Sequence, residues 1–135
     1  MRLPERYRHI ELLGEGATCE VYLVDDLVCQ RQVAIKVVRA NLAIHDRFRV
    51  RFAREVSLLA NVVHPHIVPV HDMGELEGGR PFVAMAYAGR GSMADLLCTQ
   101  PSIKNVLLVI DQVLDALGCL HARGLVHQDL KPDNV

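Results

Sequence analysis

Apolar and polar positions alternate along the first part of the chain, which is the pattern of half-buried β-strands. Five stretches show this alternation or a β-branched composition: residues 7–13, 20–24, 32–38, 68–73 and 80–87. The connections among the first three stretches are short, which favours antiparallel hairpins, and a turn at Gly78-Gly79 joins the last two stretches. The pattern therefore predicts five strands in the first part of the chain.

The spacing becomes helical after the third strand. Phe48, Phe52 and Leu59 recur on one side of a helix that Asp46 would cap. The helix should end before the turn His64-Pro65-His66, because the residue before a proline is disfavoured in helices. These histidines have no acidic or thiol residue at metal-ligand spacing, so we do not expect a metal site.

The last third of the chain is predominantly helical. Ser92 is the expected cap of a short helix through Cys98, and Ser102 is the expected cap of a long helix to about Arg123, with Gly124 as its stop. The core stripe predicted for the long helix consists of Leu107, Ile110, Leu114, Leu117 and Leu120. We therefore divide the chain into a strand-rich part (1–87), a connection (88–91) and a helical part (92–135).

Composition narrows the class of protein. Half of the 135 residues are hydrophobic and the net charge is -1, so a folded core is expected and there is no electrostatic reason to bind nucleic acid or a membrane surface. The four cysteines form no CxxC pair and are expected to be free, buried thiols. No segment is apolar over the thickness of a bilayer. We expect a cytoplasmic protein with no membrane segment in these residues.

Two charged residues occupy positions that the hydrophobic pattern assigns to the interior. Lys36 lies inside the strand 32–38 on the same face as Ala34, and Glu55 falls on the apolar stripe of the helix that begins near Asp46. A buried charge is costly unless it is paired, so each residue is a natural partner for the other. The alternative is a solvated lysine on an edge strand and a glutamate at the margin of the helix face.

A glycine-rich loop, Gly14-Glu15-Gly16, lies between the first two predicted strands. Glycines let backbone N–H groups approach a phosphate closely, because no Cβ intervenes. A strand follows the loop at 20–24, whereas a dinucleotide-binding fold would place a helix there. The P-loop pattern also fails, because no Gly-Lys-Ser/Thr sequence follows.

Together with motifs further along, these residues resemble the eukaryotic-type serine/threonine protein kinases, particularly those of bacteria. Six motifs occur in the family's order: Gly14-Glu15-Gly16 with Val21, Val33-Ala34-Ile35-Lys36, Glu55, His64-Pro65-His66-Ile67, Met85-Ala86-Tyr87-Ala88, and His127-Gln128-Asp129-Leu130-Lys131-Pro132-Asp133-Asn134. The resemblance covers nearly the whole chain. It implies an α+β protein-kinase fold, with a five-stranded antiparallel sheet and one helix in the small lobe, followed by the first helices and the catalytic loop of the large lobe.

The resemblance also implies ATP and Mg²⁺ as cofactors and protein serine or threonine hydroxyls as the acceptors of phosphate. The residues that it assigns to the nucleotide are Gly14, Glu15, Gly16, Val21, Ala34, Lys36, Met85 and the backbone of Ala86 and Ala88. Lys36 would hold the α- and β-phosphates and would be oriented by Glu55. The strand-rich part would therefore be the ATP-binding part.

The catalytic loop carries the remaining assignments. By resemblance, Asp129 would accept the proton of the attacking hydroxyl, Lys131 would steady the transferring phosphoryl group, and Asn134 would bind one Mg²⁺. The pair Lys131-Pro132 is similar to that of serine/threonine rather than tyrosine kinases.

Three features depart from the family's pattern. Cys19 stands in place of the loop's third glycine and should stiffen or crowd the loop tip, which would weaken ATP binding without abolishing it. Gln128 replaces an arginine that pairs with a phosphate on the activation segment, so activation should not depend on that phosphate. The 135 residues contain no DFG aspartate and no activation segment, so we expect little or no phosphoryl transfer from this chain alone.

Two other interpretations stay open at this point. The chain could be a truncated, pseudokinase-like module that binds nucleotide or competes for the partners of a full kinase. It could also be a small-molecule phosphotransferase of the kinase-like type. The strand motif that contains Lys36 and the Lys131-Pro132 pair argue against the second interpretation.

Overall fold

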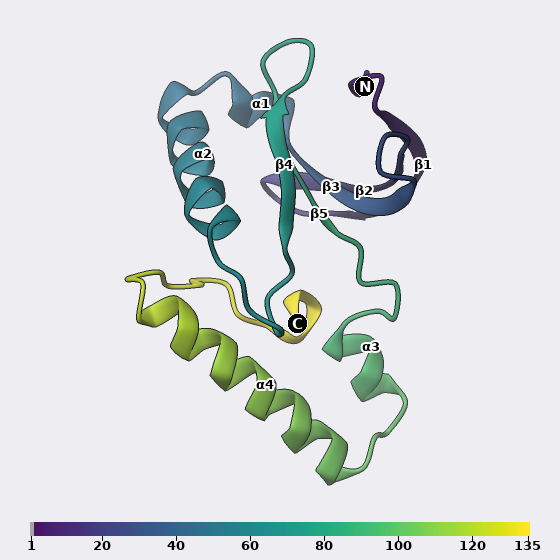
Figure 1. The fold of residues 1–135 in the computed structure, drawn as a ribbon, viewed down its shortest axis with the longest axis vertical. Coiled ribbons are helices and arrows are strands. Elements are labelled where there is room, and N and C mark those ends of the chain that lie inside the picture. The colour runs from purple at the N-terminus through teal and green to yellow at the C-terminus, as the bar shows by residue number, and fades with distance from the viewer. Residues whose placement is uncertain (1) are drawn as a thin grey trace. The chain divides into compact units, whose positions relative to one another are not determined.

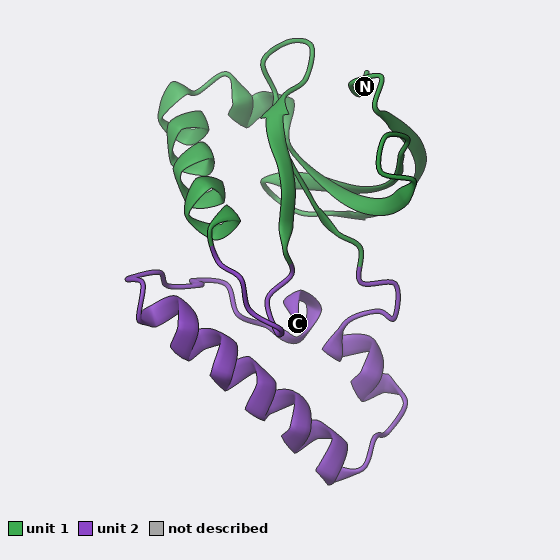
Figure 2. Cartoon of the chain, viewed as in Figure 1, with its two compact units in different colours: residues 1–61, 69–87 green, residues 62–68, 88–135 purple. Residues whose placement is uncertain are grey.

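A computed structural model describes residues 2–135. The chain forms two compact units, shown in different colours in Figure 2. The first unit runs up to residue 61 and includes 69–87, and the second contains 62–68 and 88–135. All strands belong to the first unit. The segment 62–68, which the hydrophobic pattern did not separate from the strand-rich part, belongs to the second.

A five-stranded antiparallel sheet is the framework of the first unit (Figure 1). Its strands are β1 (Tyr7–Glu15), β2 (Cys19–Asp26), β3 (Arg31–Val38), β4 (Val70–Glu75) and β5 (Pro81–Ala86). They lie in the order β1-β2-β3-β5-β4, so β3 is central. The predicted sheet is confirmed. Gly78 and Gly79 precede β5 with φ values of 85° and 73°, a conformation that favours glycine.

The strand register sorts side chains onto two faces of the sheet. Val21 lies opposite Lys36 and Lys36 lies opposite Val83, while Ala34 lies opposite Met85. Directly opposed residues of antiparallel strands point to the same side, so these five residues share one face. We call it the Lys36 face. The alternate residues of the same strands point to the other face.

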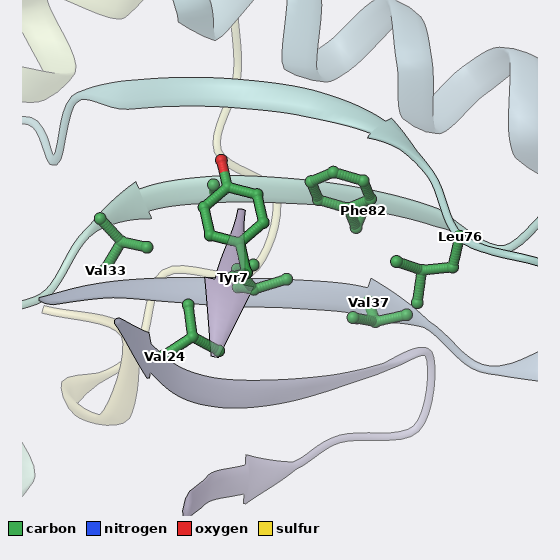
Figure 3. Packing of buried hydrophobic residues seen from close by; sticks show 8 residues of the cluster. Tyr7, Val24, Val33, Val37, Leu76 and Phe82 are labelled. Atoms are coloured by element: carbon green, nitrogen blue, oxygen red, sulfur yellow. The ribbon is translucent and has the colours of Figure 1, made fainter. Parts of the chain in front are cut away.

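The other face carries the main hydrophobic cluster of the first unit. Its members are Tyr7, Val24, Val33, Ile35, Val37, Leu76, Phe82 and Ala84. In Figure 3 the rings of Tyr7 and Phe82 lie side by side; they meet edge to face with their centroids 6.2 Å apart. Each fully buried valine or isoleucine contributes about 1.5–3 kcal/mol of hydrophobic stabilisation, so this cluster holds the central strands together.

Two helices pack at one end of the Lys36 face. They are α1 (Ala40–Ala43), which the sequence pattern did not predict, and α2 (Asp46–Ala60). Phe48 and Phe52 of α2 pack against a second cluster that consists of Cys19, Val38 and Ala43. Val38 is two residues beyond Lys36 on β3, so α2 covers the sheet next to that lysine.

The buried face of α2 differs from the predicted stripe. Val56 is buried, whereas Glu55 is exposed and Leu59 is 37% exposed. The covered face is centred on Phe52 and Val56, so Glu55 lies at its margin, as the alternative interpretation proposed. Asp46 is the first residue of the helix rather than its cap, and the preceding residue at the cap position makes no side-chain hydrogen bond.

The second unit consists of α3 (Met93–Cys98), α4 (Ile103–His121) and a short 3-10 turn, η1 (Pro132–Asn134). Ser92 caps α3 in a reciprocal capping box with Asp95, and Ser102 caps α4, so both predicted caps are confirmed. Gly124 follows α4 with a φ of 71°, as expected of a helix stop. The η1 turn was not predicted.

The predicted core stripe of α4 is wrong at Leu107, Ile110 and Leu114, which are 57%, 40% and 61% exposed. Leu120 is buried as predicted, and Ala116 is buried beside it. The helix carries apolar residues around much of its circumference, so the 3.6-residue period alone does not select the covered face.

All four cysteines are free, as predicted. The predicted burial is correct for Cys19 and wrong for the others, because Cys29 and Cys98 are exposed and Cys119 is partly exposed. Within residues 2–135, no helix combines the length and the apolar content that crossing a membrane requires.

Candidate active site

The first unit brings four of the predicted nucleotide-contacting residues to one face of its sheet. Val21, Ala34, Lys36 and Met85 share the Lys36 face through the register of β2, β3 and β5. Ala34 is buried and the other three are half-buried. This face therefore presents one cation among apolar side chains, which suits a ligand with an apolar ring and an anionic group.

Lys36 and Glu55 are not paired in the structure. The Glu55 carboxylate accepts a hydrogen bond from Arg51 Nε at 2.8 Å, one helical turn earlier. Among the described residues, no carboxylate lies within ion-pair distance of Lys36. The predicted Lys36–Glu55 pair is therefore absent. Glu55 pairs with Arg51 instead, because side chains four residues apart on one helix are neighbours on its surface.

The loop Gly14-Glu15-Gly16 comprises the last two residues of β1 and the first residue of the turn to β2. Gly14 lies opposite Val21, and the Gly16 N–H donates to the Cys19 carbonyl at 2.8 Å. A Cβ added to Gly14 would meet no atom within 4 Å, and one added to Gly16 would make only an ordinary contact at 3.6 Å. Neither glycine has a positive φ. The hairpin therefore does not require glycine at either position. The close approach of a ligand is a physical reason for glycine at both.

Cys19 does not crowd the loop tip. Its side chain is buried in the cluster with Val38 and Ala43, next to α1. The prediction that Cys19 crowds the tip is therefore wrong, whereas a stiffer loop and weaker ATP binding stay predictions. The side chain is accommodated because it points to the covered end of the Lys36 face.

The backbone after Met85 is only partly available to a ligand. The Ala86 N–H donates to the Pro69 carbonyl at 3.0 Å. The Ala88 N–H has no acceptor in the part of the chain that the structure describes. Of the two predicted backbone positions, Ala88 is therefore the one with an available donor.

Two predicted site residues, Lys131 and Asn134, converge on the carboxylate of a third, Asp129, in the second unit. Asn134 Nδ2 donates to Asp129 Oδ2 at 3.0 Å and to the Asp129 backbone carbonyl at 2.8 Å. Lys131 Nζ lies 3.6 Å from the same Oδ2. The side chains of Asp129 and Lys131 are 71% and 51% exposed, so this carboxylate is accessible to a second molecule.

Local backbone bonds create this convergence. The Asp129 N–H donates to the His127 carbonyl at 2.8 Å, and Gln128 between them has a φ of 62°, which residues other than glycine rarely adopt. Pro132 then begins η1, where its fixed φ suits a first helical turn. The η1 turn returns Asn134 to Asp129. A strained residue beside a convergent polar cluster is typical of functional sites.

His64 has an acidic neighbour that sequence spacing did not reveal. Its Nε2 lies 3.3 Å from Asp115 Oδ2 on α4, and His66 Nε2 lies 4.0 Å from the same oxygen. The contact joins the segment 62–68 to α4 within the second unit. In residues 2–135 no group of three His, Cys, Asp or Glu side chains has the arrangement of a metal site.

Sequence reasoning missed a charged network at the base of the glycine loop. Glu20 accepts hydrogen bonds from Arg80 Nη2 at 2.7 Å and from the Tyr22 hydroxyl at 3.1 Å. The bond from Arg80 is the main cause of a lowered pKa at Glu20. Arg39, the first residue after β3, contacts the loop itself. The sequence signal for Arg39 was only its place at the end of the strand that carries Lys36.

Comparison with known proteins agrees with this geometry. The family model described as "Protein kinase domain" matches residues 7–135. The chain is 39% identical over 138 residues to serine/threonine-protein kinase PknB of Mycobacterium tuberculosis, and the match covers 98% of this chain and 22% of PknB. It is 34% identical over 144 residues to serine/threonine-protein kinase PknD of Chlamydia trachomatis, a match that covers 97% of this chain and 15% of PknD.

A solved structure matches the fold as well as the sequence. The crystal structure of a single mutant of the Mycobacterium tuberculosis PknI kinase domain has a TM-score of 0.83 and 35% sequence identity to this chain. The match covers 100% of this chain and 58% of the PknI chain, whereas the chain spans about a fifth of the length of PknB. On these matches, the chain belongs to the protein kinase family and is related to the bacterial serine/threonine kinases.

Proposed function

We propose that this chain supplies the ATP-binding residues and the catalytic loop of a serine/threonine protein kinase, which transfers the γ-phosphoryl group of ATP to protein hydroxyls. The observation that carries the proposal is the meeting of Lys131 and Asn134 at the Asp129 carboxylate. In this proposal residues 1–87 are the small lobe, 88–91 the connection, and 92–135 the start of the large lobe. A cytoplasmic location, where ATP is available, belongs to the same proposal.

The proposed catalytic base is Asp129. Its Oδ2 interacts with Asn134 and Lys131, while its Oδ1 accepts no hydrogen bond from the described residues. A carboxylate with one fixed and one available oxygen can orient a hydroxyl and accept its proton as the hydroxyl attacks phosphorus. The ammonium group of Lys131 lies on the same side and would offset the negative charge of the transferred phosphoryl group.

Asn134 is the proposed contribution to a magnesium site. Mg²⁺ prefers oxygen ligands, and Asn134 uses its Nδ2 for Asp129, which leaves its Oδ1 for a cation. One amide oxygen fits the ion as part of a ligand set that the phosphates of ATP would extend. When bound, the ion neutralises charge on those phosphates.

The Lys36 face is the proposed site of the nucleotide. Lys36 would contact the α- and β-phosphates, Val21, Ala34 and Met85 would contact the adenine, and the loop 14–16 would cover the phosphates through its backbone. The register that gathers the four side chains on one face supports this assignment. Glu55 would orient Lys36 only after leaving Arg51.

The test is phosphoryl transfer from radiolabelled Mg²⁺-ATP to serine- and threonine-containing protein substrates, with the full-length gene product and two variants of it. Asp129→Asn should lower the rate by at least about 100-fold, because general-base catalysis contributes on the order of 10²–10⁴-fold. Asp133→Asn is the matched control: it removes the same charge from η1, and we expect wild-type activity. Transfer by Asp129→Asn at the wild-type rate would contradict the proposal.

A second candidate function is a pseudokinase-like module that binds nucleotide without catalysis. The observation that favours it is the Arg51–Glu55 bond, which occupies the carboxylate proposed to orient Lys36. Tight binding of ATP with no transfer to any protein substrate, in the wild type and in Arg51→Ala, would support this candidate.

A further inference from the structure

Arg39 ties the glycine loop to the end of β3. Its Nε donates to the Gly16 carbonyl at 2.7 Å, and its Nη2 donates to Glu15 Oε2 at 3.0 Å. Its backbone N–H also donates to the Thr18 carbonyl at 2.9 Å. One residue therefore makes hydrogen bonds to three residues at the hairpin tip, Glu15, Gly16 and Thr18.

The guanidinium of Arg39 is itself held in place. Its Nη1 lies 3.8 Å from Glu20 Oε1, and Glu20 Oε2 accepts a hydrogen bond from Arg80 Nη2 at 2.7 Å. Arg80 Nε in turn donates to the Val38 carbonyl at 2.8 Å, one residue before Arg39. The side chain of Arg39 is 31% exposed and that of Glu20 is 19% exposed, so these bonds are partly shielded from water.

This arrangement restricts the tip of the hairpin, at residues 15–18. Gly16 has no Cβ, so its own backbone has more conformational freedom than that of other residues. Without the Arg39 side chain, the tip would keep two backbone bonds, from the Gly16 N–H to the Cys19 carbonyl and from the Arg39 N–H to the Thr18 carbonyl. A loop that is ordered before a ligand arrives loses less conformational entropy on binding, so the ligand binds more tightly.

We propose that Arg39 is a positioning residue that holds the glycine loop over the phosphates of the bound nucleotide. The inference rests on the proposed function and adds a residue to its ATP site. Arg39 contacts the loop through the Gly16 carbonyl and the Glu15 carboxylate, and it does not need to contact the nucleotide. Because the loop covers phosphates rather than the adenine, the effect of Arg39 should appear with ATP and not with adenosine.

The experiment compares wild type, Arg39→Met, Arg39→Lys and Arg8→Met by titration with Mg²⁺-ATP and with adenosine. Arg39→Met keeps much of the length of the side chain but removes all its donors, and should raise the Kd for ATP about 3–10-fold while leaving the Kd for adenosine unchanged. Arg39→Lys should recover part of the loss, because lysine restores the charge but not the planar fork. Arg8→Met is the matched control, because it removes the same charge from an exposed pair with Asp25 on the same hairpin.

Hydrogen exchange of the amides of residues 14–19 in the absence of nucleotide is the second readout. Arg39→Met should speed exchange there and leave β5 unchanged. The inference would be overturned if Arg39→Met had the same ratio of ATP affinity to adenosine affinity as the wild type. Unchanged hydrogen exchange at residues 14–19 in Arg39→Met would also overturn it. If the wild type binds adenosine and ATP equally weakly, the proposed function fails, and the nucleotide role of Arg39 fails with it.

Discussion

Some residues of the candidate site are not required by the fold itself. Gly91 shows the opposite case: its φ is 84°, and a Cβ there would lie 2.8 Å from Asp95 Oδ2, so the fold itself requires glycine. Gly14 has neither restriction. Lys36 is likewise a half-buried cation with no carboxylate within ion-pair distance in residues 2–135. The fold does not require a glycine at position 14 or an unpaired lysine at position 36. A bound ligand would explain why these residue types occur there.

Replacement of Gly14 by alanine should therefore separate stability from binding. We expect the free energy of unfolding of Gly14→Ala to stay the same or to rise by up to about 1 kcal/mol, because alanine restricts the unfolded chain. The Kd for Mg²⁺-ATP should rise, because the added methyl group would stand where the proposed function places the phosphates. Chemical denaturation and ATP titration measure the two effects.

Gly91→Ala is the matched control for this substitution and should show a clear loss of stability. A Gly14→Ala protein with lowered stability and unchanged ATP affinity would mean that the glycine serves the hairpin and not the nucleotide.

Between elements, the strands of the sheet are joined at one end by a buried charge. Asp26, at the end of β2, is the buried charged residue of the described core, and it accepts hydrogen bonds from Arg6 at 2.7 and 2.8 Å. Arg6 also donates to Asp72 on β4 at 3.2 Å, and the Tyr7 hydroxyl donates to the same carboxylate at 2.8 Å. The hydrogen bond from Arg6 is the main cause that holds the pKa of Asp26 well below its usual range, against the opposing effect of burial.

This pair makes stability depend on pH in a defined direction. The pKa of Asp26 is lower in the folded than in the unfolded chain, where it is about 3.9, so its contribution is fully present above about pH 4. The contribution declines as the pH falls below that value towards the folded pKa. Asp26→Asn should lower the free energy of unfolding by about 1–3 kcal/mol at neutral pH and should flatten its acid dependence.

Urea denaturation between pH 2 and pH 7 measures both effects, a window set by the unfolded pKa of about 3.9. The control is Asp25→Asn, which removes a neighbouring carboxylate whose partner Arg8 is 70% exposed, and which should change stability little. An Asp26→Asn protein with the acid dependence of the wild type would show that another group is responsible.

The elements show which features the sequence pattern could predict and why. The five strands follow from alternation, and the caps at Ser92 and Ser102 follow from side-chain chemistry that acts within one turn. The roles of Asp129, Lys131 and Asn134 came from the family resemblance, and the structure shows that the three residues meet within one loop. The short elements α1 and η1 and the cap of α2 escaped prediction, but the strands and the two serine caps were predicted well.

Features that depend on tertiary packing were not. Glu55 sits at the margin of α2 because Val56 is the position that meets the sheet, and one residue on a helix is a rotation of about 100°. Cys19 turned inward because α1, itself not predicted, provides Ala43 as a neighbour. The contacts of Arg39 could not be predicted from its place at the end of β3, because its acceptors are loop carbonyl and carboxylate groups more than 20 positions earlier in the chain.

Over the whole molecule, the two units differ in how fully their apolar side chains are covered. The sheet of the first unit buries Val24, Val33, Ile35 and Val37 completely. In the second unit, Leu107 and Leu114 of α4 are more than half exposed. The Lys36 face, the proposed nucleotide site, therefore lies in the unit with the more complete core. Its role can be tested by measuring nucleotide binding, without an assay of phosphoryl transfer.

The most direct test of the account is calorimetric titration of Mg²⁺-ATP into the wild type, Lys36→Met and Lys104→Met. Lys104 is an exposed lysine of α4, so Lys104→Met makes the same change of charge away from the sheet. We expect saturable 1:1 binding of ATP to the wild type and to Lys104→Met. Lys36→Met should bind ATP at least about 10-fold more weakly, because loss of a charged hydrogen bond costs about 1.5–3 kcal/mol. Equal affinities of the three proteins for ATP, or no binding to any of them, would contradict the assignment of the Lys36 face as a nucleotide site.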